Sequence, residues 1–118
     1  MRIKTADAAG FIANLVPFKA GNLRGEAVAV LSAPPTTSGL PAEYAARLRE
    51  AQIERTQRYL AGAGRDAVQD APRYIVSSYG LPVAWVTLAG EVVVPPVTHT
   101  GTIARHQRIA RAALVPIP

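Results

Sequence analysis

The sequence predicts an α+β fold: a small antiparallel β-meander of about four strands, with N- and C-terminal helices and one inserted helix. Between Tyr74 and Val94, three apolar runs alternate with turn residues, which is typical of antiparallel strands. Three other stretches repeat apolar residues at helical spacing. With 118 residues the chain has the length of one domain. We therefore expect a single domain over residues 1–118, in which residues 33–66 form a loop and the inserted helix.

The first part of the chain predicts a short helix and then a strand. Residues 5–15 place apolar side chains on one helical face, with Thr5 available as the N-cap, and the helix must end before Pro17. The Gly- and Asn-rich segment that follows favours turns with positive φ. Val28 and Val30 then alternate with Ala residues, so we expect the first strand here.

The inserted helix follows a Pro-, Ser- and Thr-rich loop at residues 33–41. It begins near Pro41 and ends in the Ala-Gly-Ala-Gly sequence at 61–64. Two pairs of opposite charge at i,i+4 support it, namely Glu43 with Arg47 and Glu54 with Arg58.

The meander itself is predicted from three runs, RYIVSSY, VAWVTL and EVVV. A Gly80-Leu81-Pro82 turn separates the first two, an Ala89-Gly90 turn separates the second pair, and Pro95-Pro96 stops the last strand. A final amphipathic helix runs from about Thr102 to Leu114.

Composition limits the classes of function. The chain has 13 Lys and Arg against 8 Asp and Glu, a formal charge of +5, which favours acidic partners or serves solubility alone. It has no cysteine, which excludes disulfides and thiolate metal sites and fits a cytoplasmic location. No apolar run approaches the ~20 residues of a membrane span. We expect no cofactor, no metal and no membrane partner.

The last helix carries two candidate features. Arg105, Arg108 and Arg111 share its outer arc, where they could contact nucleic-acid phosphates or form a solvated face. His106 falls within the apolar arc, as a hydrogen-bonded core residue or as the floor of a pocket. His99 is the only other histidine, and two lone histidines are a weak metal signal.

Enzyme chemistry has little support in the sequence. Ser77 and Ser78 supply hydroxyls, but no nucleophile motif accompanies them. The Thr-rich segment before the last helix, with Thr98, Thr100 and Thr102, either caps the helix or holds an anion at its N-terminus. We leave the enzyme class open and lean towards a protein that is not an enzyme.

Four ordered blocks of the chain resemble a known group of proteins. They are PFKAGNLRG at 17–25, YIVSSYGLPVAW at 74–85, GEVVV at 90–94 and THTGTIARHQ at 98–107. In these blocks the chain resembles a loose group of small, functionally uncharacterised proteins of bacteriophages, prophages and plasmids. Their shared pattern is a PFKxxNLxG segment, a YxVxSYGxPIAxW-like strand pair, a Gly turn with a further strand and a Thr-rich TTxxHQ ending. The Thr-His-Thr-Gly-Thr run departs from the tighter Tyr-Ser-x-Thr-Thr run of that group.

The resemblance implies an origin in a mobile element and a set of shared polar residues. These residues are expected to meet at one end of the sheet, as a binding surface or as a network that fixes the fold; they are Lys19, Asn22, Thr100, Thr102, His106 and Gln107. We expect a phage or mobile-element accessory protein that binds a host or viral protein. The alternatives are a basic nucleic-acid-binding module and a small hydrolase or nuclease that depends on His106 or His99. A homo-oligomer is compatible with each.

Overall fold

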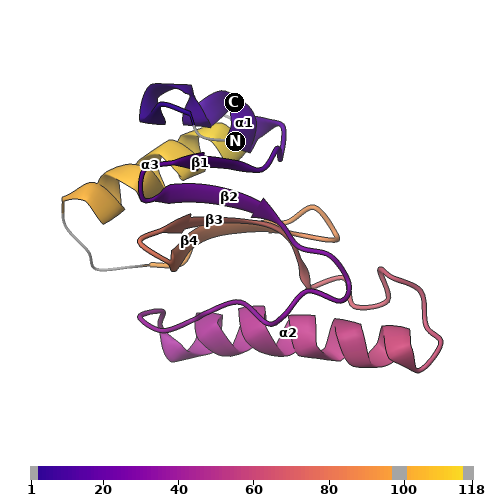
Figure 1. Cartoon of the computed structure of the whole chain (residues 1–118). Helices are drawn as coiled ribbons and strands as arrows, with labels where there is room; N and C mark the ends of the chain where they lie inside the picture. The colour runs from indigo at the N-terminus through magenta and orange to yellow at the C-terminus, as the bar shows by residue number, and fades with distance from the viewer. Residues whose placement is uncertain (1–2, 97–100, 116–118) are drawn as a thin grey trace.

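A computed structural model describes residues 3–96 and 101–115 of the chain. In these residues the fold is α+β, as predicted, and its sheet has five strands where about four were expected (Figure 1). The helices are α1 (Ala8–Ala13), preceded by a 3₁₀ turn (Thr5–Asp7), α2 (Ala42–Leu60) and α3 (Thr102–Leu114). The strands are β1 (Phe18–Ala20), β2 (Leu23–Ala27), β3 (Pro72–Ser78), β4 (Leu81–Thr87) and β5 (Val92–Val93).

The sheet is a meander whose spatial order follows the chain, with every neighbouring pair antiparallel. Its first hairpin corrects the prediction of a strand around Val28 and Val30, because β1 and β2 lie earlier and that segment follows them. Ala20 pairs with Leu23, so Gly21-Asn22 is the turn, and Gly21 has the positive φ of 61° that a type II′ turn requires at this position.

The hairpin between β3 and β4 also turns one residue earlier than predicted. Ser78 pairs with Leu81, so the turn is Tyr79-Gly80, and Leu81 begins β4. Both turn residues have positive φ, 53° at Tyr79 and 79° at Gly80, as a type I′ turn demands. Asn, Asp and Gly are the residues that usually occupy these positions, so a tyrosine here is unusual.

A β-bulge shapes the central strand β4. Val76 pairs with Ala84 and Ser77 with Pro82, which leaves Val83 as an extra residue. Both Val83 and Ala84 therefore pack in the same core cluster, and the following Trp85 packs in the cluster on the other side of the sheet. All seven residues of β4 are buried, because helices cover this strand on both faces.

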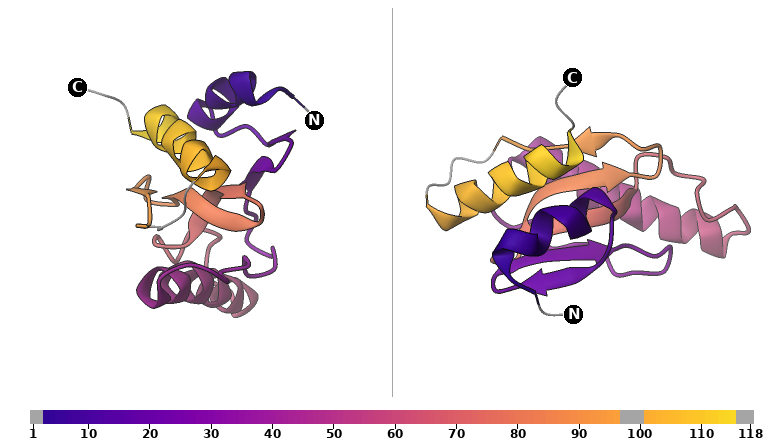
Figure 2. Two further views of the ribbon diagram at one scale, coloured as in Figure 1. Left: turned by 90° about the vertical axis from the view of Figure 1, so that its left-hand side faces the viewer. Right: turned by 90° about the horizontal axis from the view of Figure 1, so that it is seen from above.

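The sheet lies between two helical layers, α1 with α3 on one face and α2 on the other (Figure 2). The first layer covers a core that includes Ile12, Leu23 and Val76. In the second layer, Leu48 of α2 packs against Ile75, Trp85 and Val93. Both layers bury apolar surface, which is the main stabilising contribution to the fold.

The predicted helix α2 carries one of the two predicted ion pairs. Arg58 lies 3.4 Å from Glu54, as expected. Arg47 does not pair with Glu43; it binds Asp70 at 2.7 Å and Glu91 at 2.8 Å and so links α2 to the loops beside β3 and β5. Hydrogen bonds to these carboxylates raise the pKa of Arg47 above its usual range. Within the described ranges, no helix combines the length and apolar character needed to cross a bilayer.

Candidate binding cleft

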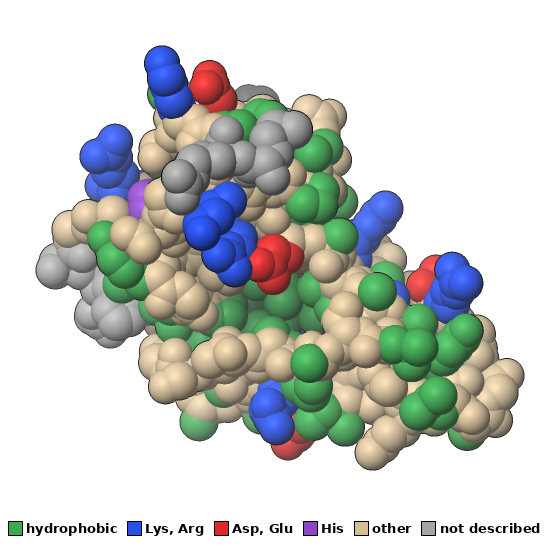
Figure 3. All heavy atoms as spheres, viewed as in Figure 1, with side chains coloured by type: hydrophobic (Ala, Val, Ile, Leu, Met, Phe, Trp, Pro, Cys, Tyr) green, Lys and Arg blue, Asp and Glu red, His purple; other side chains and the backbone are tan. Residues whose placement is uncertain are grey.

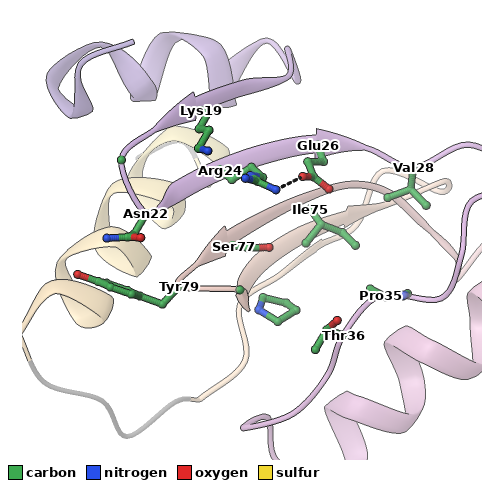
Figure 4. Close-up of a pocket in the computed structure, with 13 residues that line it drawn as sticks. Lys19, Asn22, Arg24, Glu26, Val28, Pro35, Thr36, Ile75, Ser77 and Tyr79 are labelled. Atoms are coloured by element: carbon green, nitrogen blue, oxygen red, sulfur yellow. Dashed lines mark hydrogen bonds and ion pairs between the residues drawn. The ribbon is translucent and has the colours of Figure 1, made fainter. Parts of the chain in front are cut away.

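A cleft of about 700 Å³ opens on the α2 side of the sheet, over β1, β2 and β3 (Figure 4). We call it the hairpin-tip cleft, because the turns of both hairpins contribute to it. Its lining residues are Lys19, Gly21, Asn22, Arg24, Glu26, Val28, Pro35, Thr36, Ile75, Ser77, Tyr79, Gly80 and Pro82.

The floor of the hairpin-tip cleft follows from strand alternation. In β2, Leu23 and Gly25 are buried, so Arg24 and Glu26 project to the opposite face. The strand register aligns the polar side chains in a row across the sheet, because Arg24 lies opposite Lys19 on one side and opposite Ser77 on the other. The sheet thus places three donor-bearing side chains from three strands next to one another.

The hairpin-tip cleft is open because α2 does not cover the β1–β2 part of this face. The buried side chains of α2 reach the strands β3, β4 and β5. The opposite wall is the loop before α2, at Pro35 and Thr36 (Figure 4). In the space-filling view, a hollow with hydrophobic side chains separates the sheet from the α2 layer (Figure 3).

Side chains of α2 fix the segment that precedes this wall. The amide of the buried Gln52 donates hydrogen bonds to the carbonyls of Ala29 (3.0 Å) and Ser32 (3.1 Å). Thr56 donates to the carbonyl of Val30 at 2.7 Å. Such bonds satisfy backbone groups of an irregular segment that no strand pairs. The loop that forms the wall of the hairpin-tip cleft therefore follows directly on a segment that α2 holds in place.

Arg55 completes this anchoring. This residue is 5% exposed, and its guanidinium donates to the carbonyls of Arg65 (3.1 Å), Val28 (3.0 Å) and Pro72 (3.4 Å). Burial lowers the pKa of Arg55, and the nearby charge of Asp66 opposes this shift. The planar fork of an arginine suits several carbonyls at once, so Arg55 joins three backbone segments around α2.

The two hairpin turns meet at one end of the hairpin-tip cleft. The backbone N–H of Tyr79 donates to the carbonyl of Asn22 at 2.9 Å. The side chain of Tyr79 is 57% exposed, and its ring lies at this end beside Asn22 (Figure 4). An exposed aromatic residue in a strained backbone conformation is thus held at the rim of the hairpin-tip cleft.

The charges of the hairpin-tip cleft leave an excess of hydrogen-bond donors. Arg24 and Glu26 form an ion pair of 3.2 Å, with side chains 49% and 61% exposed. Such exposed pairs contribute little free energy, about 0–1 kcal/mol. Lys19 forms no ion pair among the described residues. The net formal charge of the lining is therefore positive.

The structure separates the predicted binding residues into two groups. Lys19 and Asn22 both line the hairpin-tip cleft. Thr102, His106 and Gln107 belong to α3, which packs on the opposite face of the sheet. The remaining residue, Thr100, lies outside the described residues, as do Thr98 and His99. The N-cap of α3 is Gly101, a residue without a side chain that could cap the helix.

His106 is a core residue of the α3 layer. It is 5% exposed, and its Nδ1 lies 2.7 Å from the hydroxyl of Ser78, which is fully buried. Burial lowers the pKa of His106, and the adjacent charge of Arg105 adds to this effect. The imidazole therefore favours its neutral form. Of the two alternatives for His106, the structure shows the hydrogen-bonded core residue.

Gln107 also has a structural role. Its amide donates to the carbonyls of Val83 (3.1 Å) and Pro95 (2.8 Å). Val83 is the extra residue of the bulge in β4, where the ladder leaves backbone groups without a strand partner. Gln107 therefore ties α3 to the bulge and to the segment after β5.

The arginines of α3 face solvent. Arg105, Arg108 and Arg111 are exposed, and none makes an ion pair within residues 3–96 and 101–115. In the view of Figure 3, basic side chains occupy several separate places and do not form one continuous patch. At the β5 edge, Val93 and Pro95 are buried.

Three residues that line the hairpin-tip cleft were not predicted to be binding residues; they are Arg24, Ser77 and Tyr79. The alternation of buried and charged residues in β2 was the available signal for Arg24. Tyr79 could be identified only from the exact position of the turn, and the turn lies one residue earlier than the sequence predicts. No cluster of three or more metal-binding side chains occurs among the residues that the structure describes.

The fold and the hairpin-tip cleft together define a small α+β protein with an open, donor-rich cleft on one face of an antiparallel sheet. Comparison of the chain with protein-family models, curated proteins and solved structures finds no match.

Proposed function

We propose that the protein is a non-catalytic binding module, an accessory protein of a phage or mobile element that binds a host or viral protein in the host cytoplasm. Its binding site is the hairpin-tip cleft. The observation that carries this proposal is Tyr79, an aromatic side chain 57% exposed at the rim, with φ at 53°. The resemblance of the four sequence blocks supplies the mobile-element context.

Two physical arguments support a binding role for Tyr79. A non-Gly residue with positive φ costs of order 1 kcal/mol, and such strain is concentrated at functional sites. Exposed tyrosines are also enriched among the residues that dominate binding energy at protein interfaces. The side chain of Tyr79 does not belong to the hydrophobic clusters of buried residues, so core packing does not offset the cost of its backbone conformation.

Affinity capture from a host lysate tests the proposal. The tagged protein and its Tyr79→Ala variant are compared with a Leu60→Ala variant, which removes another exposed apolar side chain (72% exposed) at the end of α2. We expect a discrete, nuclease-resistant protein that is retained by the parent and by Leu60→Ala and lost by Tyr79→Ala. Capture that is equal for all three proteins would refute the hairpin-tip cleft as the binding site.

Nucleic-acid binding is the second candidate function, and the exposed arginines of α3 favour it. Arg105, Arg108 and Arg111 occur on one helix without ion pairs among the described residues. Binding through phosphates should weaken steeply as salt rises. Fluorescence anisotropy with labelled DNA and RNA at low and high salt measures this, with the triple Arg→Gln variant as the control. No shift at low salt would remove this candidate.

A further inference from the structure

We infer that the hairpin-tip cleft recognises a peptide segment that presents a carboxylate beside an apolar side chain. This inference rests on the proposed function and names the chemistry of the partner. Three features of the cleft support it: the surplus of donors, the apolar part of its lining and the placement of Tyr79.

The donors of the hairpin-tip cleft suit an anion. Lys19 and Arg24 carry positive charge, and Asn22, Ser77, Thr36 and Tyr79 add neutral donors. Glu26 is the single acidic residue of the lining, and Arg24 already binds it. Lys19 lies opposite Arg24 in the register, and Arg24 lies opposite Ser77. A carboxylate above this row can accept charge-assisted hydrogen bonds from more than one strand.

The apolar part of the lining argues for a peptide. Val28, Pro35, Ile75 and Pro82 lie in the same hairpin-tip cleft as the donors. An apolar side chain next to the carboxylate would bury surface against them. The volume of about 700 Å³ accommodates a few side chains and lies within the range of small binding sites.

The same charges argue against a nucleic-acid strand in this cleft. A strand presents a phosphate at every nucleotide, and its recognition requires several available cations. Among the described lining residues, only Lys19 is a cation without an ion pair. A single carboxylate matches this charge, and the exposed Arg24–Glu26 pair can rearrange around it at little cost.

Tyr79 marks one end of the site. Its ring lies at the end of the cleft where the two turns meet, beside Asn22 and across from the apolar end marked by Val28 (Figure 4). A tyrosine there can contact a peptide with its ring and its hydroxyl, and it has few rotatable bonds to immobilise.

Selection from a random-peptide display library tests the inference. The parent protein is used for selection, and the enriched peptides are then measured on three variants: Lys19→Gln, Tyr79→Asn and Arg49→Gln. The last is a matched control, because Arg49 is an exposed residue of α2 that does not line the cleft. We expect peptides rich in Asp or Glu next to an apolar residue, with affinity about tenfold weaker on Lys19→Gln and on Tyr79→Asn and unchanged on Arg49→Gln.

The outcomes separate this inference from the proposed function. Two outcomes would refute the inferred carboxylate of the ligand without affecting the proposed function. The enriched peptides could require Tyr79 but carry no acidic residue, or they could bind Lys19→Gln as tightly as the parent. Peptides that bind all three variants equally, or no enrichment at all, would refute the inferred ligand class. The lysate capture described above, with Tyr79→Ala, then decides separately whether the hairpin-tip cleft binds any protein.

Discussion

Gly25 should be among the least replaceable residues of the chain, and Gly25→Ala tests the packing of the β1–β2 hairpin. A Cβ atom at Gly25 would overlap the hydroxyl of Tyr74 and lie 2.5 and 2.8 Å from ring atoms of Phe18. Both aromatic residues are buried, and the Tyr74 hydroxyl donates to the carbonyl of Val16 at 2.8 Å. The added methyl group must therefore displace two aromatic rings that have little room to move.

The expected cost has two parts. Overpacking of a core typically destabilises a protein by about 1–3 kcal/mol. Displacing Tyr74 also weakens its hydrogen bond to Val16, a further loss of about 1 kcal/mol. The sum, roughly 2–4 kcal/mol, is a large fraction of the typical 5–15 kcal/mol of a domain and should lower the Tm by about 8–16 °C.

Urea unfolding followed by the fluorescence of Trp85 measures this change, because Trp85 is the only tryptophan and is fully buried. Tyr74→Phe provides the control, since it removes the hydroxyl that the new Cβ would overlap. Gly25→Ala should cost about 1 kcal/mol less in the Tyr74→Phe background than in the parent. A loss below about 1 kcal/mol for Gly25→Ala in the parent would refute the packing argument.

Three further predictions concern the turn, the α3 layer and α2. Tyr79→Asn should raise the free energy of unfolding by about 0.5–1 kcal/mol, because Asn-Gly suits a type I′ turn; a lower Tm would contradict this. The pKa of His106 is lowered in the folded state, so its contribution to stability is present above the unfolded pKa of roughly 6.5 and is lost as the pH falls. Urea unfolding between about pH 7.5 and 5.5 should show a slope that His106→Asn reduces by up to about 1.4 kcal/mol per pH unit, and an equal slope in both proteins would exclude this role. Arg55→Lys should lower the unfolding free energy by about 1–3 kcal/mol, since an ammonium cannot reproduce the fork of donors to three carbonyls; urea unfolding that matches the parent would contradict it.

The helices and the meander could be predicted because their signals are local. The apolar spacing and the flanking prolines placed the start of α3 at Thr102 and its end at Leu114, as observed. The first hairpin was misread, because β1 has only three residues, too few to show a period. Val28 and Val30 gave a stronger alternating signal, yet they belong to the segment that α2 anchors.

The candidate site could be predicted only in part, because a cleft depends on which faces the helices leave uncovered. Lys19 and Asn22 were predicted, but their neighbours Arg24 and Ser77 follow from strand register, which single-sequence patterns do not specify. A threonine was expected to cap α3, whereas its N-cap is Gly101. The alternative of an anion site stays a prediction, because Thr98 and Thr100 lie outside the described residues.

Several residues of the four sequence blocks have structural roles in this chain. Gly25 makes room for Tyr74, Ser78 binds His106, and Gln107 satisfies the bulge at Val83. These contacts join segments that are far apart in the sequence. Of the polar residues that the shared pattern specifies, Lys19, Asn22 and Tyr79 line the hairpin-tip cleft.

The segment that contains α2 enters and leaves the sheet at neighbouring points, since the N–H of Val28 donates to the carbonyl of Arg73 at 2.9 Å just beyond the paired residues Ala27 and Tyr74. A gene rearrangement that exchanged residues 28–71 would therefore keep the register of β2 and β3. It would replace the Pro35–Thr36 wall while the row of side chains on the strands stayed in place. Any replacement must still shield Trp85 from water. The two walls of the hairpin-tip cleft thus come from parts of the chain that can change separately: the strands that hold the charged residues, and the segment between them.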